Sequence, residues 1–321
     1  MRRKLIITAG FCFLMIMQVL AQNPNAPAAR SGYSMAYDAN RGVVVVFGGQ
    51  DTASRQLGDT WEWSAGSWKQ ITATGPSARI NAAMAYDPDK KLVFLFGGRT
   101  IAGPENDLWT YDGSSWSKIN TAGQPPPRQL GTMAFDKGQS QVVLFGGMDA
   151  DKRGIGDTWI LKNNKWTAIA ARGPSPRASH CMAYNDALGA VVIYGGYIDD
   201  AASKEFWELK NGAWQEIVNG DGPARIHAAI AYDPDKSRML LFGGFNETVR
   251  TNELWQYANN KWSIITGDNN KIPVQRAEHR CVFIPGQGLF VFGGVIGPDP
   301  NTRNRSNDTW LYNGNSWTKL N

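Results

Sequence analysis

Six pairs of adjacent glycines recur along this chain at a nearly constant interval, and no other feature restricts the possible folds as strongly. The pairs begin at intervals of 49, 49, 49, 48 and 50 residues, at Gly48, Gly97, Gly146, Gly195, Gly243 and Gly293. An aromatic residue precedes every pair. Repeats of about 20–50 residues are typical of solenoids, propellers and arrays. The chain is therefore expected to use one structural unit six times.

Other landmarks occupy the same place in every repeat. An arginine that follows a proline by two or three residues opens each one: Arg30, Arg79, Arg128, Arg177, Arg225 and Arg276. Two tryptophans seven residues apart follow each glycine pair, and only Trp63 lies outside this pattern: Trp61/Trp68, Trp109/Trp116, Trp159/Trp166, Trp207/Trp214, Trp255/Trp262 and Trp310/Trp317. An acid stands two residues before each first tryptophan: Asp59, Asp107, Asp157, Glu205, Glu253 and Asp308.

Each repeat contains four candidate β-strands, here named A to D in chain order. In the second repeat they are RINAAMAYD, KLVFLFGG, NDLWTYD and SWSKIN. Turns with Asn-Gly or Asp-Gly between C and D suit tight hairpins. Strand B is apolar without alternation, which indicates that both of its faces are buried. Small antiparallel sheets that pack face to face around an axis meet this requirement, as in a β-propeller.

A repeat with Pro-x-x-Arg, an aromatic before Gly-Gly and spaced aromatics ending in tryptophan resembles the kelch repeat. The resemblance covers residues 27–320. It implies an all-β, six-bladed propeller, similar to the central domain of galactose oxidase, with four antiparallel strands per blade and one contiguous repeat per blade. The approximate blades are 27–74, 75–123, 124–172, 173–221, 222–270 and 271–321. With no exchanged strand, blades one and six are expected to meet only through side chains, at the weakest junction.

The N-terminus resembles a secretory signal peptide, because three basic residues precede an apolar run from Leu5 to Leu20. We predict cleavage after Ala21, a single propeller domain over 22–321, a secreted or periplasmic location and no membrane span after cleavage. Cleavage leaves 33 − 3 = 30 basic against 28 acidic residues, which argues against nucleic acid as a partner. Only Cys181 and Cys281 then remain, too few for a disulfide framework, so the fold depends on burial.

The repeated glycines are interpreted as structural, supplying unusual backbone angles and close approach where strand B leaves the sheet. The opening arginines and the acids are expected on one rim, because strands A and C run in the same direction. A guanidinium offers a carboxylate two parallel hydrogen bonds. We therefore predict an architectural ring of ion pairs, formed by Arg30, Arg79, Arg128, Arg177, Arg225 and Arg276 with Asp59, Asp107, Asp157, Glu205, Glu253 and Asp308.

Loops that differ between repeats gather on the same rim. From the second glycine to the first tryptophan the intervals are 11, 10, 11, 10, 10 and 15 residues, with little shared sequence. The D–A connections also vary, and residues 264–275 form the longest. Binding residues tend to lie on variable loops held by a rigid scaffold. This B–C and D–A loop face, above all at blade six, is the predicted ligand surface.

All three histidines fall near the start of strand A, in repeats four to six: His180, His227 and His279. With Glu278 and Arg280 they are candidate ligand-binding residues at the mouth of the central channel. The alternative, which we favour, is that each histidine bonds to a neighbouring blade. His180 and Cys181 do not form a catalytic dyad, because adjacent strand residues point to opposite faces. No metal site or cofactor is expected, since zinc needs three or four converging ligands.

Kelch propellers serve several classes of function, so the fold alone does not decide between them. The sequence favours an exported, monomeric binding module for an unidentified protein or glycan rather than an enzyme. The alternative is an exported sugar epimerase or mutarotase similar to sialic acid mutarotase, with Glu278, His279 and Arg280 at the channel mouth. A copper radical oxidase is disfavoured, because its crosslinked tyrosine–cysteine pair and copper ligands do not map onto this chain. A purely structural surface repeat is the third possibility.

Overall fold

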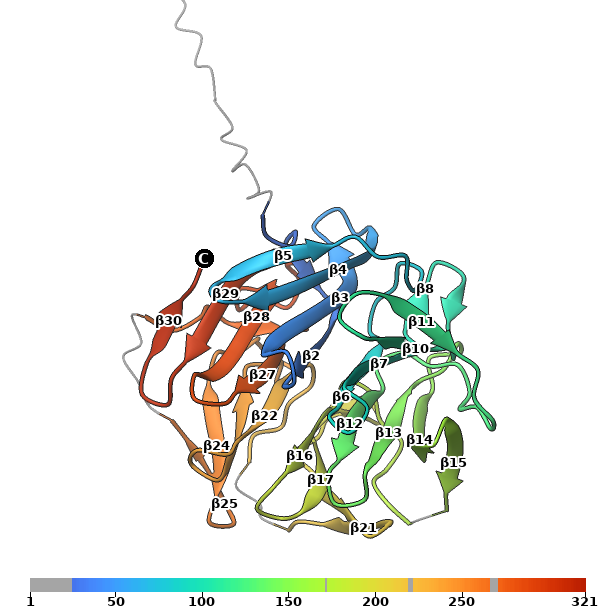
Figure 1. Ribbon diagram of the computed structural model, residues 1–321. Helices are drawn as coiled ribbons and strands as arrows, with labels where there is room; N and C mark the ends of the chain where they lie inside the picture. Colours follow the sequence, from blue (N-terminus) through green and yellow to red (C-terminus); the bar gives the residue numbers. More distant parts are fainter. Residues whose placement is uncertain (1–24, 171, 219–221, 266–270) are drawn as a thin grey trace, which may run out of the picture.

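The computed structural model describes residues 25–170, 172–218, 222–265 and 271–321. Six antiparallel sheets surround a central axis, as Figure 1 shows. Each sheet comes from one contiguous repeat, which confirms the predicted six-bladed propeller. The proposed signal peptide lies outside the described residues. In the part of the chain that the structure describes, no helix is long and apolar enough to cross a membrane.

The four strands of a blade run outward from the axis in the order A, B, C, D. Strand A is β2 (Ser34–Asp38), β6 (Ala83–Asp87), β12 (Thr132–Asp136), β16 (Cys181–Asn185), β22 (Ala229–Asp233) or β27 (Arg280–Ile284). Strand B is β3 (Val43–Asp51), β7 (Leu92–Phe96), β13 (Gln141–Met148), β17 (Ala190–Tyr194), β23 (Arg238–Phe242) or β28 (Gly288–Ile296). Strand C is β4 (Gln56–Ser64), β10 (Leu108–Tyr111), β14 (Gly154–Lys162), β20 (Phe206–Lys210), β24 (Leu254–Ala258) or β29 (Arg305–Tyr312). Strand D is β5 (Ser67–Ile71), β11 (Trp116–Ile119), β15 (Lys165–Ile169), β21 (Ala213–Glu216), β25 (Lys261–Ile264) or β30 (Trp317–Lys319).

Six short strands add to this plan. Two of them, β1 (Arg30–Ser31) and β26 (Arg276–Ala277), pair with the ends of β3 and β28. The other four form two small hairpins in the B–C loops of blades two and four, β8 (Arg99–Thr100) with β9 (Gly103–Pro104) and β18 (Tyr197–Ile198) with β19 (Ala201–Ala202). The variable loops therefore have local structure that the repeat pattern does not specify.

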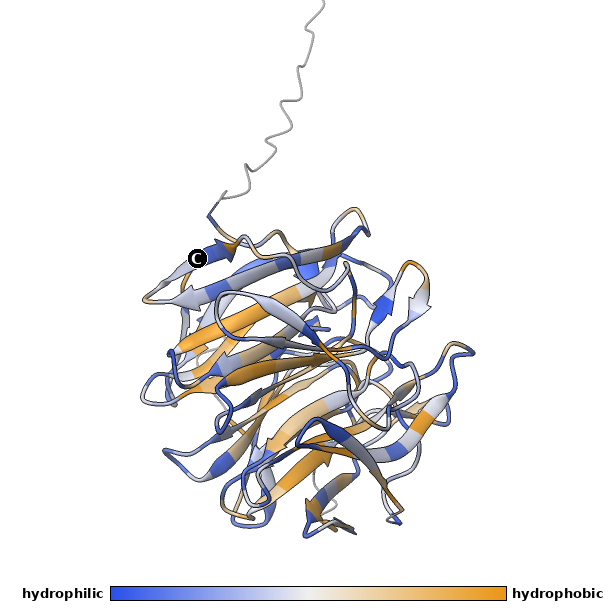
Figure 2. Cartoon of the chain, turned by 45° about the vertical axis from the view of Figure 1, so that its right-hand side comes forward, coloured by the Kyte–Doolittle hydropathy of each residue, from blue (hydrophilic) through white to orange (hydrophobic). Residues whose placement is uncertain are grey.

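The hydrophobic core is divided among the six junctions between blades. Each buried cluster combines side chains of two neighbouring blades, so one cluster fills each junction. Strand B supplies its centre, and Val44, Leu95 and Ile193 are fully buried. Figure 2 shows the same strands as the most hydrophobic parts of the chain. The prediction that strand B is buried on both faces is confirmed, because it lies between two blades.

The junction between blades one and six is built like the others. Trp63, the tryptophan outside the repeat pattern, packs there against Phe290 with ring centroids 5.6 Å apart. Trp68 donates a hydrogen bond of 3.1 Å from Nε1 to Oγ1 of Thr309, as Trp116 does to Thr60 at 2.9 Å in the next junction. The expectation of contact through side chains alone is wrong, because the Gly32 amide donates a backbone hydrogen bond of 3.2 Å to the Glu278 carbonyl.

That backbone bond belongs to a closed circle of six around the channel mouth, hereafter the mouth ring. In each blade, the residue two after the opening arginine donates its N–H to the carbonyl of the equivalent residue in the preceding blade, at 2.6–3.3 Å. The ring consists of Gly32, Asn81, Leu130, Ser179, His227 and Glu278. All six have positive φ angles, between 54° and 63°. This left-handed conformation costs a residue other than glycine about 1–2 kcal/mol, so the ring is held by the surrounding contacts.

A comparison of two substitutions at Leu130 tests this backbone demand. Leu130→Gly is expected to be more stable than Leu130→Ala by about 1 kcal/mol, because only alanine retains a Cβ that opposes the left-handed conformation. Both variants lose the leucine side chain, so their difference isolates the backbone. Urea denaturation followed by tryptophan fluorescence measures it. A more stable alanine variant would show that the ring does not require this conformation.

Candidate functional site

The loop-face rim contains one ion pair per blade. Each opening arginine is buried and meets the acid of its own repeat: Arg30–Asp59, Arg79–Asp107, Arg128–Asp157, Arg177–Glu205, Arg225–Glu253 and Arg276–Asp308. In every blade the first tryptophan donates its indole N–H to the same acid. The pairs therefore join the start of strand A to the start of strand C.

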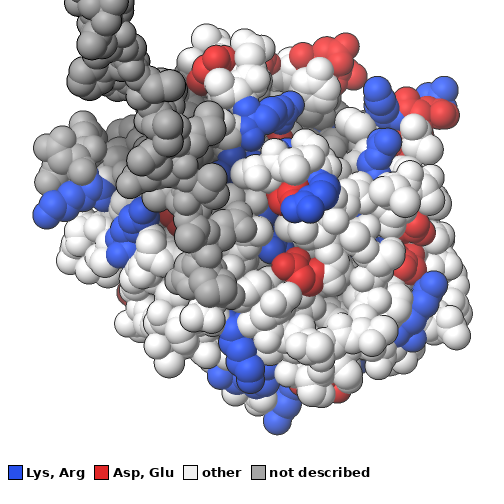
Figure 3. Space-filling view, turned by 90° about the horizontal axis from the view of Figure 1, so that it is seen from above, with Lys and Arg blue, Asp and Glu red and all other residues white. Residues whose placement is uncertain are grey.

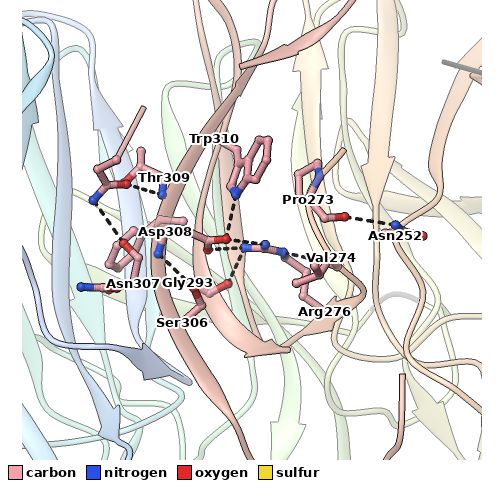
Figure 4. A network of polar contacts seen from close by, with 12 residues as sticks. Asn252, Pro273, Val274, Arg276, Gly293, Ser306, Asn307, Asp308, Thr309 and Trp310 are labelled. Atoms are coloured by element: carbon pink, nitrogen blue, oxygen red, sulfur yellow. Dashed lines mark hydrogen bonds and ion pairs between the residues drawn. The ribbon is translucent and has the colours of Figure 1, made fainter. Parts of the chain in front are cut away.

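The pair in blade six shows how completely these groups are engaged (Figure 4). Arg276 binds Asp308 through two hydrogen bonds of 2.8 and 2.9 Å and donates a third, of 3.0 Å, to the carbonyl of Gly293. Burial favours a higher pKa for Asp308, but Arg276 outweighs it and holds the pKa below its ordinary value. The Arg276 carbonyl also accepts a 2.8 Å bond from the Gly244 amide of blade five. These contacts indicate an architectural role.

The glycine pairs leave room for this contact between the opening arginine's carbonyl and the preceding blade. Gly48 has a φ of +68°, and a Cβ added there would lie 2.7 Å from the carbonyl oxygen of Arg79 in the next repeat. Any larger residue would both strain the backbone and push the blades apart. The geometry at Gly48 agrees with the structural interpretation of the glycine pairs.

Two of the three histidines lie between blades. The ring of His180 packs on Phe145 of blade three, with centroids 5.4 Å apart, and its Nε2 is 2.6 Å from Oγ1 of Thr132. His279 is fully buried and packs on Phe242 of blade five at 5.3 Å. Tyr33 has the same place in blade one and packs on Phe292 of blade six at 5.3 Å. Where the residue three after the opening arginine has a ring, that ring thus packs on strand B of the preceding blade.

Burial keeps both of these imidazoles neutral. Desolvation, assisted by the charge of Arg177, lowers the pKa of His180 to about 3. Desolvation likewise holds the pKa of His279 well below its ordinary value. Among the described residues no group of three or more His, Cys, Asp or Glu side chains is placed to hold a metal ion. Between the blades these two histidines act as packing groups.

His227 and Glu278 belong to the mouth ring. Glu278 is also part of a group of polar side chains, here called the mouth cluster: Ser31, Gln50, Glu278, Arg303 and Arg305. Glu278 accepts hydrogen bonds of 2.9 Å from Ser31 and 3.0 Å from Arg303. Arg305 donates to Ser31 at 3.0 Å and to Gln50 at 2.8 Å. The cluster joins the first and last blades. The Arg303 side chain is 65% exposed, so the cluster can reach a ligand on the loop face.

The protonation states in this region follow from the arrangement of charges. Burial acts to raise the pKa of Glu278, but His227, Ser31 and Arg303 together bring it below its ordinary value. Desolvation lowers the pKa of His227 even though the carboxylate opposes this shift. At neutral pH the mouth therefore presents an ionised carboxylate, a neutral imidazole and two guanidinium groups.

Arg250, in the B–C loop of blade five, organises the long loop of blade six. Its buried guanidinium donates hydrogen bonds to the carbonyls of Gly297, Asp299, Pro300 and Thr302. The loop that it holds leads directly to Arg303 and Arg305. The sequence reasoning did not identify Arg250 or these two arginines, because the variable loops share no pattern in which a functional residue would stand out.

The central channel encloses about 100 Å³. The first two residues of every A strand contribute to its wall: Ser34/Met35, Ala83/Met84, Thr132/Met133, Cys181/Met182, Ala229/Ile230 and Arg280/Cys281. Cys181 and Cys281 are both free thiols. Burial raises the pKa of Cys181 to about 12, and that of Cys281 also lies above its ordinary value. The thiols stay protonated, so neither is an activated nucleophile.

The structure thus separates the five candidate ligand-binding residues predicted from the sequence. His180 and His279 pack between blades, although His180 also borders the channel. His227 and Glu278 lie in the mouth ring, and Arg280 lines the channel wall. Of the five, only Glu278 belongs to the mouth cluster, and His227 lies beside it. In the view of Figure 3, basic and acidic side chains are interspersed rather than gathered into a field of one sign.

Fold and repeat geometry define a six-bladed β-propeller whose blades are each fastened by an arginine–carboxylate–tryptophan network. A family model described as the KLHDC2/KLHL20/DRC7 Kelch-repeats domain matches residues 15–196 and 184–321. The chain therefore belongs to the kelch-repeat family. Kelch propellers commonly act as protein-interaction modules. A search of curated proteins found no match to this chain.

Proposed function

We propose that this protein is an exported binding module that holds a protein or glycan ligand on its B–C and D–A loop face. The observation that carries the proposal is the mouth cluster, in which an exposed guanidinium and an ionised carboxylate lie beside the channel mouth. Charged groups of both signs on a rigid scaffold suit a polar partner better than an apolar one. The proposal of export rests on the N-terminal sequence.

Charge reversal at the mouth cluster tests the binding surface. Arg303→Glu and Arg305→Glu are expected to weaken ligand binding at least tenfold, because each places a negative charge beside Glu278. If the ligand is a glycan, a glycan array probed with the mature protein measures the loss. If it is a protein, a photoreactive crosslinker at position 303 should capture the partner on secreting cells, and an excess of the purified protein should reduce this capture.

The matched control is Lys69→Glu, which makes the same charge change on an exposed residue of the outermost strand, β5. It is expected to bind as the wild type does. Equal loss in all three variants would indicate a general charge effect, and full binding by the mouth variants would place the ligand elsewhere. N-terminal sequencing of the secreted protein tests export independently, with Gln22 as the expected first residue.

The adjacency of Glu278 and His227 supports a second candidate, a sugar mutarotase or epimerase. An ionised carboxylate beside a neutral imidazole can accept and return a proton during ring opening. Of the three residues proposed from the sequence, Glu278 belongs to the mouth cluster, whereas His279 is buried between blades and Arg280 lines the channel. NMR can follow the anomerisation of fresh α-aldoses. Acceleration that is lost in Glu278→Gln would favour this activity, and no acceleration would exclude it for those sugars.

A further inference from the structure

Arg280 places a single cation in the channel, on the side of the mouth ring away from the mouth cluster. It is the first residue of β27, at a position where other blades have serine, alanine, threonine or cysteine. Among the described residues that line the channel, Arg280 is the only charged one. The one hydrogen bond of its guanidinium to the described protein runs 3.1 Å from Nη1 to the carbonyl of His279.

The charge of Glu278 acts on this cation, but the two side chains do not form an ion pair. Within the described part of the chain no carboxylate lies within the 4.0 Å of an ion pair with Arg280. Glu278, two residues before Arg280, directs its two oxygens to Ser31 and Arg303 instead. An arginine does not lose its proton under ordinary conditions. The guanidinium is half-buried in the channel wall and forms no ion pair, so its free donors favour an anion.

We propose that the central channel binds a small monovalent anion, such as chloride or formate, through the Nε and Nη2 donors of Arg280. Each A strand pairs only with strand B, so its other edge faces the axis and offers further backbone N–H donors. The protonated thiols of Cys181 and Cys281 add no negative charge to the wall.

The size of the channel restricts the ligand. Its 100 Å³ exceeds the roughly 10–15 Å³ of accessible space that one water needs, so the channel can contain a small anion together with waters. Pockets for metabolites and cofactors are larger, at about 300–1,000 Å³. The channel site is therefore distinct from the surface proposed for a protein or glycan, and either proposal can fail without the other.

Thermal unfolding in defined anions tests the site. The mature protein is dialysed into sodium gluconate and titrated with sodium chloride, bromide or formate at constant ionic strength. At an anion concentration about a hundred times the dissociation constant, Tm is expected to rise by roughly 5 °C. Arg280→Ala, which introduces the residue found in blades two and five, should fold and show no rise. Arg280→Lys should keep a weaker response, because it keeps the charge.

Arg153→Gln is the matched control, since it removes a guanidinium that is 75% exposed in the B–C loop of blade three and should leave the response unchanged. In crystals soaked in bromide, anomalous scattering should place a peak beside Arg280 in the wild type only. Equal responses of the wild type and Arg280→Ala would overturn the proposal, as would a response that disappears in Arg153→Gln. Crystals soaked in bromide that show only water in the channel would overturn it as well.

Discussion

Arg276→Met is expected to lower the free energy of unfolding by about 3–5 kcal/mol, the usual cost of breaking a buried ion pair by removing one partner. The substitution leaves Asp308, whose side chain is 14% exposed, without its cation. It also removes the donor to the Gly293 carbonyl. Urea denaturation monitored by tryptophan fluorescence measures the loss.

Two further variants separate the orphaned charge from the loss of packing. The double variant Arg276→Met with Asp308→Leu should recover part of the stability, because no carboxylate is left unpaired. Arg153→Met removes an arginine that is 75% exposed from its pair with Asp151, which is 67% exposed, and should cost only about 0–1 kcal/mol. If Arg276→Met were as mild as Arg153→Met, the rim pairs would not stabilise the blades.

Acidification from pH 6.5 to 5 is expected to destabilise the protein by about 2 kcal/mol through His180 alone. The pKa of His180 falls from 6.5 in the unfolded chain to about 3 in the folded protein. Between these values the unfolded state binds a proton that the folded state does not, so stability decreases as the pH falls. His279, whose pKa is also strongly lowered, acts in the same direction. Urea unfolding across this pH range measures the slope.

His180→Ala isolates this contribution, since blades two and five have alanine at the equivalent position, at Ala82 and Ala228. The variant is expected to be less stable at pH 7.5, because the ring contact with Phe145 is lost. Its free energy of unfolding should nevertheless depend less on pH, with a slope smaller than that of the wild type by about 1.4 kcal/mol per pH unit. A slope equal to that of the wild type would mean that His180 becomes protonated in the folded protein.

The fold could be predicted because its determinants recur six times. Strand B is uniformly apolar in each repeat, and burial between two blades is the arrangement that explains it. The opening arginines and their acids could be placed on one rim from strand direction alone, and the structure has all six pairs there. A single repeat would not have distinguished these features from chance.

The site was less accessible to the same reasoning, because it depends on residues that occur once. A shift of one position along the chain moves a side chain from the junction between blades to the wall of the channel, as His279 and Arg280 show. Arg250 acts through carbonyl groups of a neighbouring loop, and such contacts leave no pattern in the residue types. The mouth ring also depends on left-handed backbone angles that Gly32 and Asn81 suit, whereas a leucine, serine or glutamate in the same place gives no sign of them.

The six equivalent junctions make the position of the chain ends arbitrary. Ala26 and Leu320, close to the two ends, both contact the hydrophobic cluster between blades one and six. Within the described residues no strand is shared between blades, and the mouth ring has the same backbone hydrogen bond at that junction as at the other five. A circular permutant that links the present ends and opens between β11 and β12 would keep every sheet intact. The closed form of this molecule thus depends on the cyclic order of its six repeats rather than on which repeat begins the chain.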